Sequence, residues 1–201
     1  MLKKIISVVI AVILLIGVSI TVSAKTDSYI RVDVPGNTTE LRKSREMFSA
    51  TGLITADSLG LEEKLEGITD IFSDDYGNIL LLCGDTSRII SIKPDYTLDK
   101  EIVVLDLDGQ QVNFKGALGI YKDSNGYIYI CDTENSRIIV VNSEGLVINT
   151  LESPDSELIP DDFLYQPVAL EKDKYGYTYI LSLGCYYGAL LYSPEDEFLG
   201  F

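Results

Sequence analysis

Short runs of apolar residues alternate with polar turns along most of the chain. The runs are rich in Ile, Val and Tyr and are bounded by Asp, Asn, Gly, Ser and Pro, a pattern that predicts short β-strands joined by tight turns. Two stretches are closely alike, since residues 77–92 read GNILLLCGDTSRIISI and residues 126–141 read GYIYICDTENSRIIVV. The chain is therefore built from a repeated unit of strands.

A D-x-x-G tetrapeptide marks each copy of the unit, and its glycine recurs after 49 and then 50 residues. The three copies are Asp74–Gly77, Asp123–Gly126 and Asp173–Gly176. This tetrapeptide favours a hairpin turn, because Asp accepts hydrogen bonds from the backbone just after it and Gly tolerates positive φ. Two apolar runs follow each turn, and in the second copy LVINTLES supplies a fourth strand.

Four short antiparallel strands at a period near fifty residues are typical of one β-propeller blade. The sequence thus predicts an all-β fold, a partial β-propeller of about three four-stranded blades. We place the blades at residues 65–114, 115–164 and 165–201, the last of them incomplete.

The second copy resembles the NHL repeat, the blade unit of NHL-type β-propellers. Residues 123–138 carry its pattern, D-x-x-G-x-I-Y-I-x-D-T-x-N-x-R-I. The first copy departs at Cys83, where the second has Asp132, and the third has Tyr186-Tyr187-Gly188 where the second has residues 136–138. The resemblance covers residues 65–201 and implies the N-terminal part of a secreted NHL repeat-containing protein.

The resemblance also implies a structural role for three polar residues of the second copy. In NHL-type propellers the Asp, Asn and Arg of the motif mostly bind neighbouring backbone and link blades. These residues are Asp132, Asn135 and Arg137 in this sequence.

Three blades are too few for a closed ring, since propellers use four to eight. Each blade buries its faces only against its neighbours. We therefore expect either the N-terminal part of a longer, six-bladed protein or a ring made from two copies. Residues 51–58 resemble residues 146–153, the last strand of the second unit, so we expect a strand within residues 46–64 that latches the ring.

The N-terminus has the layout of a secretory signal peptide. Two lysines precede an apolar run over residues 5–20, and Val22-Ser23-Ala24 offers small residues for cleavage before Lys25. The sequence thus predicts a signal peptide over residues 1–24 and a secreted or extracytoplasmic protein, the alternative being an uncleaved membrane anchor. A polar lead-in over residues 25–45 follows, in which residues 29–34 alternate as in an edge strand or form an extended tether.

The chain is strongly acidic, with 16 basic against 31 acidic residues and a net charge of −15. Lys3 and Lys4 belong to the predicted signal peptide, so without it 14 basic residues face 31 acidic ones, a net charge of −17. Such a surface repels phosphate backbones and anionic lipids, which argues against nucleic-acid and anionic-membrane partners.

The sequence contains no histidine, which removes Ser-His-Asp catalysis, histidine zinc sites and imidazole acid–base chemistry. We expect no cofactor and no metal site. Asp106-Leu107-Asp108-Gly109 is too short a run of acids for a calcium loop and predicts a hairpin turn instead. The cysteines Cys83, Cys131 and Cys185 are expected to be buried free thiols, with one disulfide as the alternative.

These features favour a non-catalytic binding or scaffold module over an enzyme. The partner is expected to be a protein, peptide or carbohydrate at a propeller face. Tyr186 and Tyr187 are the candidate binding residues, because they lie where the repeat pattern breaks. The alternative, implied by the gluconolactonase-like group of propellers, is a calcium-dependent hydrolase, although no segment reproduces a recognisable ligand set.

Overall fold

The computed structural model describes residues 29–34, 38–43, 52–160 and 162–201. Two units make up the chain, Met1–Gly52 and Leu53–Phe201. The predicted signal peptide and cleavage site lie outside the described residues. Within the described ranges, no helix combines the length and the apolar character needed to cross a membrane.

In the first unit, residues 29–34 and 38–43 of the polar lead-in form two paired strands. Strand β1 (Tyr29–Val34) pairs antiparallel with β2 (Thr38–Lys43), so that Tyr29 lies opposite Lys43. The alternation of residues 29–34 thus predicted a strand correctly.

The second unit consists of three four-stranded antiparallel sheets, each formed by strands consecutive in sequence. The first sheet contains β3 (Ile68–Ser73), β4 (Ile79–Cys83), β5 (Arg88–Ile92) and β6 (Leu98–Val103). The second contains β7 (Gly119–Lys122), β8 (Ile128–Asp132), β9 (Arg137–Val141) and β10 (Val147–Leu151). The third contains β11 (Pro167–Lys172), β12 (Thr178–Ser182), β13 (Leu190–Tyr192) and β14 (Phe198–Gly200).

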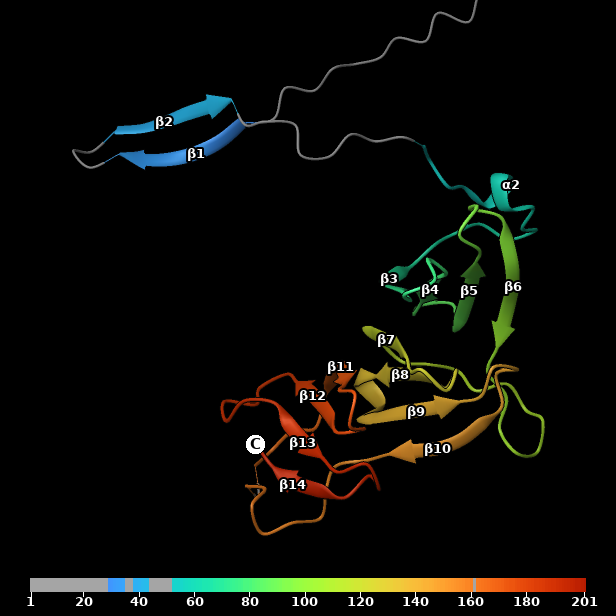
Figure 1. The fold of residues 1–201 in the computed structure, drawn as a ribbon. Helices are drawn as coiled ribbons and strands as arrows, with labels where there is room; N and C mark the ends of the chain where they lie inside the picture. The colour runs from blue at the N-terminus through green and yellow to red at the C-terminus, as the bar shows by residue number, and fades with distance from the viewer. Residues whose placement is uncertain (1–28, 35–37, 44–51, 161) are drawn as a thin grey trace, which may run out of the picture. The chain divides into compact units, whose positions relative to one another are not determined.

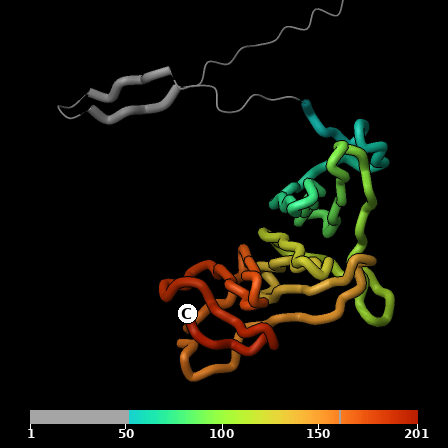
Figure 2. Tube along the Cα trace, viewed as in Figure 1, coloured from blue at the N-terminus to red at the C-terminus, as the bar shows by residue number. Residues whose placement is uncertain are grey.

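This architecture is a partial β-propeller, as the sequence predicts. The three sheets follow one another as an arc, which the chain trace displays from green to red (Figure 1, Figure 2). The first strands of the sheets, β3, β7 and β11, are neighbours across the sheet boundaries. We refer to the sheets as blades 1, 2 and 3, and to the side facing the next or the preceding blade as the forward or back face.

Side chains along the second strand of each blade point alternately to its two faces, and the apolar ones form the core between neighbouring blades. Leu80 and Leu82 on the forward face of blade 1 pack against Ile128 and Ile130 on the back face of blade 2. The same arrangement recurs one blade later, where forward residues of blade 2 pack with back residues of blade 3; these are Tyr129, Cys131, Ile138 and Val140 with Leu170, Ile180, Leu190 and Tyr192. Each blade is therefore stabilised mainly by burial against its neighbours, at roughly 25 cal/mol per Å² of apolar surface.

The expected strand within residues 46–64 is absent from its described part, residues 52–64. Instead, α2 (Ala56–Leu59) forms one helical turn. The local sequence explains the difference, because Thr55 and Ser58 cap the turn reciprocally and Gly60 ends it in a left-handed conformation with φ 71°. This correction concerns residues 52–64 only, since residues 46–51 lie outside the described ranges.

The segment around α2 covers the back face of blade 1. Leu59 and Leu61 are buried together with Leu81, Ile90 and Ile92 of β4 and β5. The first strand is less well covered, because its Ile71 remains 62% exposed. Blade 1 is thus packed on both sides, by blade 2 in front and by residues 54–65 behind.

Blade 3, which we expected to be incomplete, does include a fourth strand. Strand β14 is short, and it pairs with β13 through Leu191 and Gly200 and through Tyr192 and Phe198. Rings of Tyr192 and Phe198 meet edge to face at 5.6 Å, which supports this pairing.

The polar motif of the second blade links strands and backbone, as the resemblance to NHL repeats implied. Asp132 is fully buried, and its Oδ1 accepts a hydrogen bond from the Lys115 N–H at 2.6 Å. Its Oδ2 accepts hydrogen bonds from Asn135 Nδ2 and Arg137 Nε, each at 2.8 Å. Thr133 Oγ1 then donates to the carbonyl of Pro167 in blade 3 at 2.7 Å.

The other blades replace this network according to their sequence. Cys83 in blade 1 cannot accept the arginine, so Arg88 pairs with Glu63 at 3.1 Å and Glu101 at 2.9 Å. In blade 3, Ser182 stands in the position of Asp132, and its Oγ accepts a hydrogen bond from Gln166 N–H at 2.8 Å. The backbone link is therefore kept without the carboxylate.

The three cysteines are free thiols. Cys83 and Cys131 are fully buried and Cys185 is partly exposed. Burial raises the pKa of the Cys131 thiol to about 12, with a further rise from the Asp70 carboxylate. The predicted turn at Asp106–Gly109 is also confirmed, since the Asp106 carbonyl accepts a hydrogen bond from Gly109 N–H at 3.0 Å.

We predict that Gly119→Ala destabilises the boundary between blades 2 and 3. A Cβ at Gly119 would collide with the Val168 carbonyl of the adjoining first strand, so we expect a loss of about 2–3 kcal/mol in the free energy of unfolding. Gly109→Ala is the control, because that glycine has φ 78° and open space around its Cβ position, and we expect a loss of about 1 kcal/mol. Urea denaturation measures both, and equal losses would contradict the prediction.

We predict that Asp132→Ala costs about 3 kcal/mol of stability, because Arg137 and the Lys115 N–H then lose a buried acceptor. Ser182→Ala is the matched variant one blade later, since it removes a single backbone link and should cost about 1 kcal/mol. A denaturation series in which both variants lose the same stability would show that the carboxylate network adds nothing.

Candidate functional site

Three equivalent turns form one face of the arc, which we call the turn face. They are the turns at residues 74–77, 123–126 and 173–176 that join the first and second strands. In each, the glycine N–H donates to the Asp carbonyl at 3.0 Å, and the glycine φ is 83°, 89° or 92°. The hairpin turns predicted for the D-x-x-G sequences are thus confirmed.

Each turn carboxylate is held by backbone donors. Asp123 Oδ1 accepts hydrogen bonds from the N–H groups of Asn125 and Tyr127, both at 2.9 Å. Asp173 Oδ1 accepts from Tyr175 and Tyr177 in the same way, at 2.8 and 3.0 Å. These carboxylates are therefore fixed in position by the turns that they stabilise.

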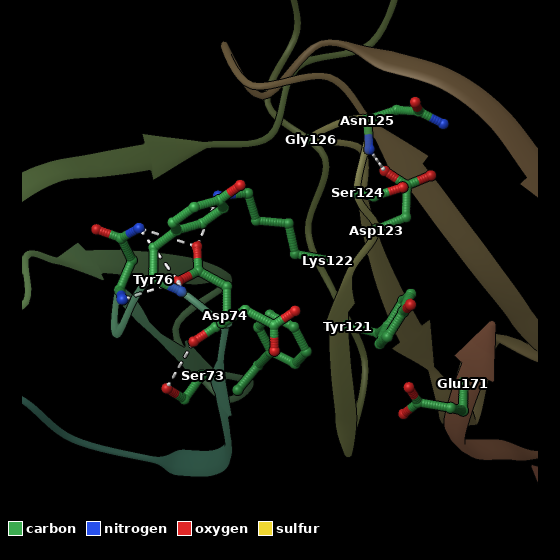
Figure 3. A pocket seen from close by; sticks show the side chains of 13 residues that line it. Ser73, Asp74, Tyr76, Tyr121, Lys122, Asp123, Ser124, Asn125, Gly126 and Glu171 are labelled. Atoms are coloured by element: carbon green, nitrogen blue, oxygen red, sulfur yellow. Dashed lines mark hydrogen bonds and ion pairs between the residues drawn. The ribbon is translucent and has the colours of Figure 1, made fainter. Parts of the chain in front are cut away.

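A groove lies on the turn face at the boundary of blades 1 and 2, with a volume of about 550 Å³. Its lining comes from the first two turns, from the ends of β3 and β7, and from Glu171 of β11. Figure 3 shows Asp74, Tyr76 and Lys122 on one side of it and Tyr121 and Glu171 on another. Polar and aromatic side chains thus share one concave surface.

An equivalent groove, of about 500 Å³, lies one blade further along. It is lined by the second and third turns, and Tyr121, Asp123, Ser124 and Asn125 belong to both grooves. Asn125 takes in the second groove the place that Tyr76 has in the first, and Tyr175 takes the place that Asn125 has in the first. The site therefore repeats with the period of the blades.

A lysine from the following blade reaches back to each groove. Lys122 Nζ lies 3.5 Å from Asp74 Oδ2, which Figure 3 shows as an ion pair across the boundary. Lys172, in the equivalent position of blade 3, donates to the Tyr129 hydroxyl at 3.1 Å, and its Nζ lies 5.0 Å from the centre of the Tyr129 ring. Each lysine thus ties its blade to the preceding one.

The electrostatics differ between the fixed and the free carboxylates. Partial burial raises the pKa of Asp74, but hydrogen bonds from the Asn78 side chain and from the Asn78 and Tyr76 backbone outweigh it, with help from Lys122, so the pKa lies below its usual value. Asp75 and Glu171 are exposed, and no hydrogen bond within the described residues engages their carboxylates. Cationic groups entering the first groove would meet these two side chains.

Burial, and next the nearby Asp123 carboxylate, raise the pKa of Tyr129 well above its ordinary value. Its hydroxyl therefore stays protonated at neutral pH. It donates to Asp123 Oδ2 at 3.4 Å while it accepts the hydrogen bond from Lys172. Tyr129 thus acts as a fixed neutral bridge between the two charged side chains.

The structure places Tyr186 and Tyr187 away from both grooves. They lie in the connection between β12 and β13 and are 96% and 63% exposed. Tyr187 packs against Phe201 with ring centres 5.1 Å apart, whereas neither tyrosine lines the turn-face grooves. Their role in binding stays a prediction.

The described residues contain no group of three or more Cys, Asp or Glu side chains placed to hold a metal ion.

Comparison with known proteins finds similarity at the level of solved structures. No protein-family model and no curated protein matches the sequence. A protein of unknown function from Bacteroides caccae is 16% identical over 70% of this chain, with a TM-score of 0.48. A catalytically inactive virginiamycin B lyase from Staphylococcus aureus with quinupristin is 14% identical over 69%, with a TM-score of 0.49.

The extracellular domain of a proposed one-component system from Bacteroides thetaiotaomicron is also similar, 15% identical over 67% of this chain, with a TM-score of 0.48. This chain spans 51%, 42% and 18% of the lengths of the three proteins, in the order given. The assignment of a partial propeller therefore rests on the three sheets themselves.

The grooves were missed from the sequence, although a signal was present. Lys122 and Lys172 each come directly before the Asp of a D-x-x-G turn, in the sequences Tyr-Lys-Asp and Glu-Lys-Asp. The recurrence of a lysine at the same repeat position, which the first copy replaces by Ser73, indicates a contact between blades.

We predict that Asp74→Ala lowers the free energy of unfolding at pH 7 by about 1–2 kcal/mol, since the turn loses its acceptor. Because the folded pKa is depressed, this contribution is present above the unfolded pKa of about 4 and is lost as the pH falls through the folded pKa. The gap between wild type and variant should therefore narrow as denaturation is repeated from pH 7 down to pH 2.5. Asp75→Ala is the control, and a gap for Asp74→Ala that stays constant with pH would contradict the prediction.

Proposed function

We propose that this chain is an extracytoplasmic β-propeller module of NHL type and that it binds a ligand without catalysing a reaction. Its binding surface is the turn face, and its ligand is an extended peptide that carries basic side chains. The single observation behind the proposal is the pair of equivalent grooves at successive blade boundaries. The NHL assignment is supported by the network of Asp132, Asn135 and Arg137.

The repetition of the grooves favours an extended ligand. The two grooves share residues of the second turn, so one chain lying across the blades could enter both. Exposed rings are available in each, since Tyr76 is 85% exposed and Tyr175 is 70% exposed. Tyrosine offers a large flat surface at low entropic cost, which suits recognition of a flexible segment.

The charge of the first groove favours basic side chains. Its lining contains Asp74, Asp75, Asp123 and Glu171 against the single cation Lys122. Lys122 is already paired with Asp74, which leaves the exposed Asp75 and Glu171 to attract a cation. The turn carboxylates themselves accept backbone hydrogen bonds, so they serve as structural acceptors more readily than as catalytic groups.

We predict that an octalysine peptide binds the protein and that the combined variant Asp75→Asn with Glu171→Gln weakens this affinity about tenfold. Isothermal titration calorimetry at low and at high salt measures the affinity, which should fall as salt screens the pairs. Glu62→Gln with Glu157→Gln is the matched control, because both acids are exposed, line neither groove and carry the same charge change. If both double variants weaken the affinity equally, the binding is explained by nonspecific attraction to the acidic chain, and the proposal is overturned.

Two further arms test the surface and the class of ligand. Tyr76→Ala should weaken the peptide and Tyr186→Ala should not; the opposite result would move the site to the connection between β12 and β13. A hexameric oligosaccharide titrated under the same conditions should not bind. If instead the saccharide binds, the peptide does not, and Tyr76→Ala abolishes saccharide binding, then the turn face remains the binding surface but the proposal of a peptide ligand is wrong.

A further inference from the structure

The forward face of blade 3 is uncovered, although the same face is buried in the other two blades. Equivalent positions on the second strand of each blade allow a direct comparison. Leu80 and Leu82 are 3% and 0% exposed, and Tyr129 and Cys131 are 5% and 0% exposed. Tyr179 and Leu181 of blade 3 are 42% and 53% exposed. Leu183, just beyond the strand, extends this apolar surface with an exposure of 48%.

At the opposite end of the arc, the second and third strands of the back face of blade 1 are covered, although Ile71 of the first strand is 62% exposed. Leu81, Ile90 and Ile92 on the back of blade 1 are 7%, 0% and 0% exposed, because Leu59 and Leu61 cover them. Among the described residues of the three blades, the forward face of blade 3 is therefore the sheet face whose second strand is left exposed.

The boundaries between blades 1 and 2 and between blades 2 and 3 show what kind of surface covers a forward face. At each boundary, a four-stranded blade lays buried side chains from alternate positions of its second strand against the forward face of the preceding blade. Ile128 and Ile130 do so over blade 1, and Ile180 does so over blade 2. A sheet that packs over Tyr179 and Leu181 should present the same alternation.

Charge at the rim adds a second requirement. The following blade contributes Lys122 at the first boundary, near Asp74, and Lys172 at the second, against Tyr129. Blade 3 repeats the receiving groups, because Asp173 corresponds to Asp74 and Tyr179 corresponds to Tyr129. Blade 3 also adds Glu171, an exposed acid where the earlier blades have Phe72 and Tyr121. A partner lysine would be attracted to this acidic rim.

We propose that the forward face of blade 3 docks a further four-stranded β-blade. This blade presents aliphatic side chains at alternate positions toward Tyr179 and Leu181, and a lysine directly before its first turn toward Asp173 and Glu171. The proposal rests on the uncovered apolar face of blade 3 and not on the ligand proposed for the turn face, although both involve Glu171.

The experiment adds a blade of this chemistry to the full chain. A second copy of residues 115–164 is appended after Phe201, because that repeat carries Lys122, Ile128 and Ile130 and already covers a forward face in blade 1. We expect a single thermal unfolding transition, raised by at least about 5 °C over the unextended chain. Amide hydrogen exchange in residues 178–183 should slow at least tenfold. An unchanged midpoint with unprotected residues 178–183 would overturn the proposal.

Matched variants test where the appended blade docks. Leu181→Asp in blade 3 should abolish the rise, whereas Leu107→Asp should preserve it, since Leu107 is 83% exposed in the turn at residues 106–109. Leu181→Asp should leave the unextended chain as stable as wild type, because the side chain is exposed there. A rise that survives Leu181→Asp would overturn docking at this face.

The rim contact has its own variant. Replacing the appended copy of Lys122 by Met should reduce the rise in midpoint by about half while keeping the transition single. If the midpoint of thermal unfolding rises as much as with the lysine, the proposed lysine contact is wrong. Light scattering of the unextended chain tests the rival occupant. A dimer that Leu181→Asp dissociates would identify a second copy at this face and overturn the docking of a further blade.

Discussion

The structure depends on aliphatic packing between successive blades. None of the three sheets has a core of its own, because the side chains of its second and third strands point alternately forward and back. A forward leucine or tyrosine is buried only if the following blade places an isoleucine over it. This constraint explains why the same apolar positions recur through the repeat, and why segments outside the sheets, such as residues 54–65, are recruited where no preceding blade is described.

Hydrogen bonds between blades fix the position of each blade relative to the next. Asp70 Oδ2 accepts a hydrogen bond from the Ile120 N–H at 2.9 Å, between the first strands of blades 1 and 2. Thr133 makes the corresponding kind of link from blade 2 to blade 3. Because a buried donor without an acceptor is costly, such bonds disfavour sliding of one blade over the next. The turn face inherits its regular geometry from this fixed register.

The architecture was readable from the sequence because it depends on local and repeated signals. The D-x-x-G turns and the alternating runs specify the hairpins without reference to distant residues. The helical turn at residues 56–59 escaped prediction because residues 51–58 resemble residues 146–153, which include β10, whereas the caps at Thr55 and Gly60 favour a helical turn. A likeness at five of eight positions was outweighed by the local hydrogen bonds of the two caps.

The candidate site was less readable, since it arises between blades. Asp74 and Lys122 are 48 residues apart and meet only when two blades pack side by side. Tyr186 and Tyr187 drew attention because they break the repeat, whereas the grooves are lined by residues that conform to it. In a repeat fold, a binding surface can lie in the shared pattern as well as in its exceptions.

The segment around α2 makes the two ends of the arc unequal in stability. Blade 1 is held from both sides, and blade 3 is held from one side only, with a three-residue outer strand at its edge. In a row of nearest-neighbour contacts, opening starts where a unit has a single neighbour. For the three blades taken alone, this principle favours local opening that starts at β14, so that the second groove of the turn face opens more readily than the first.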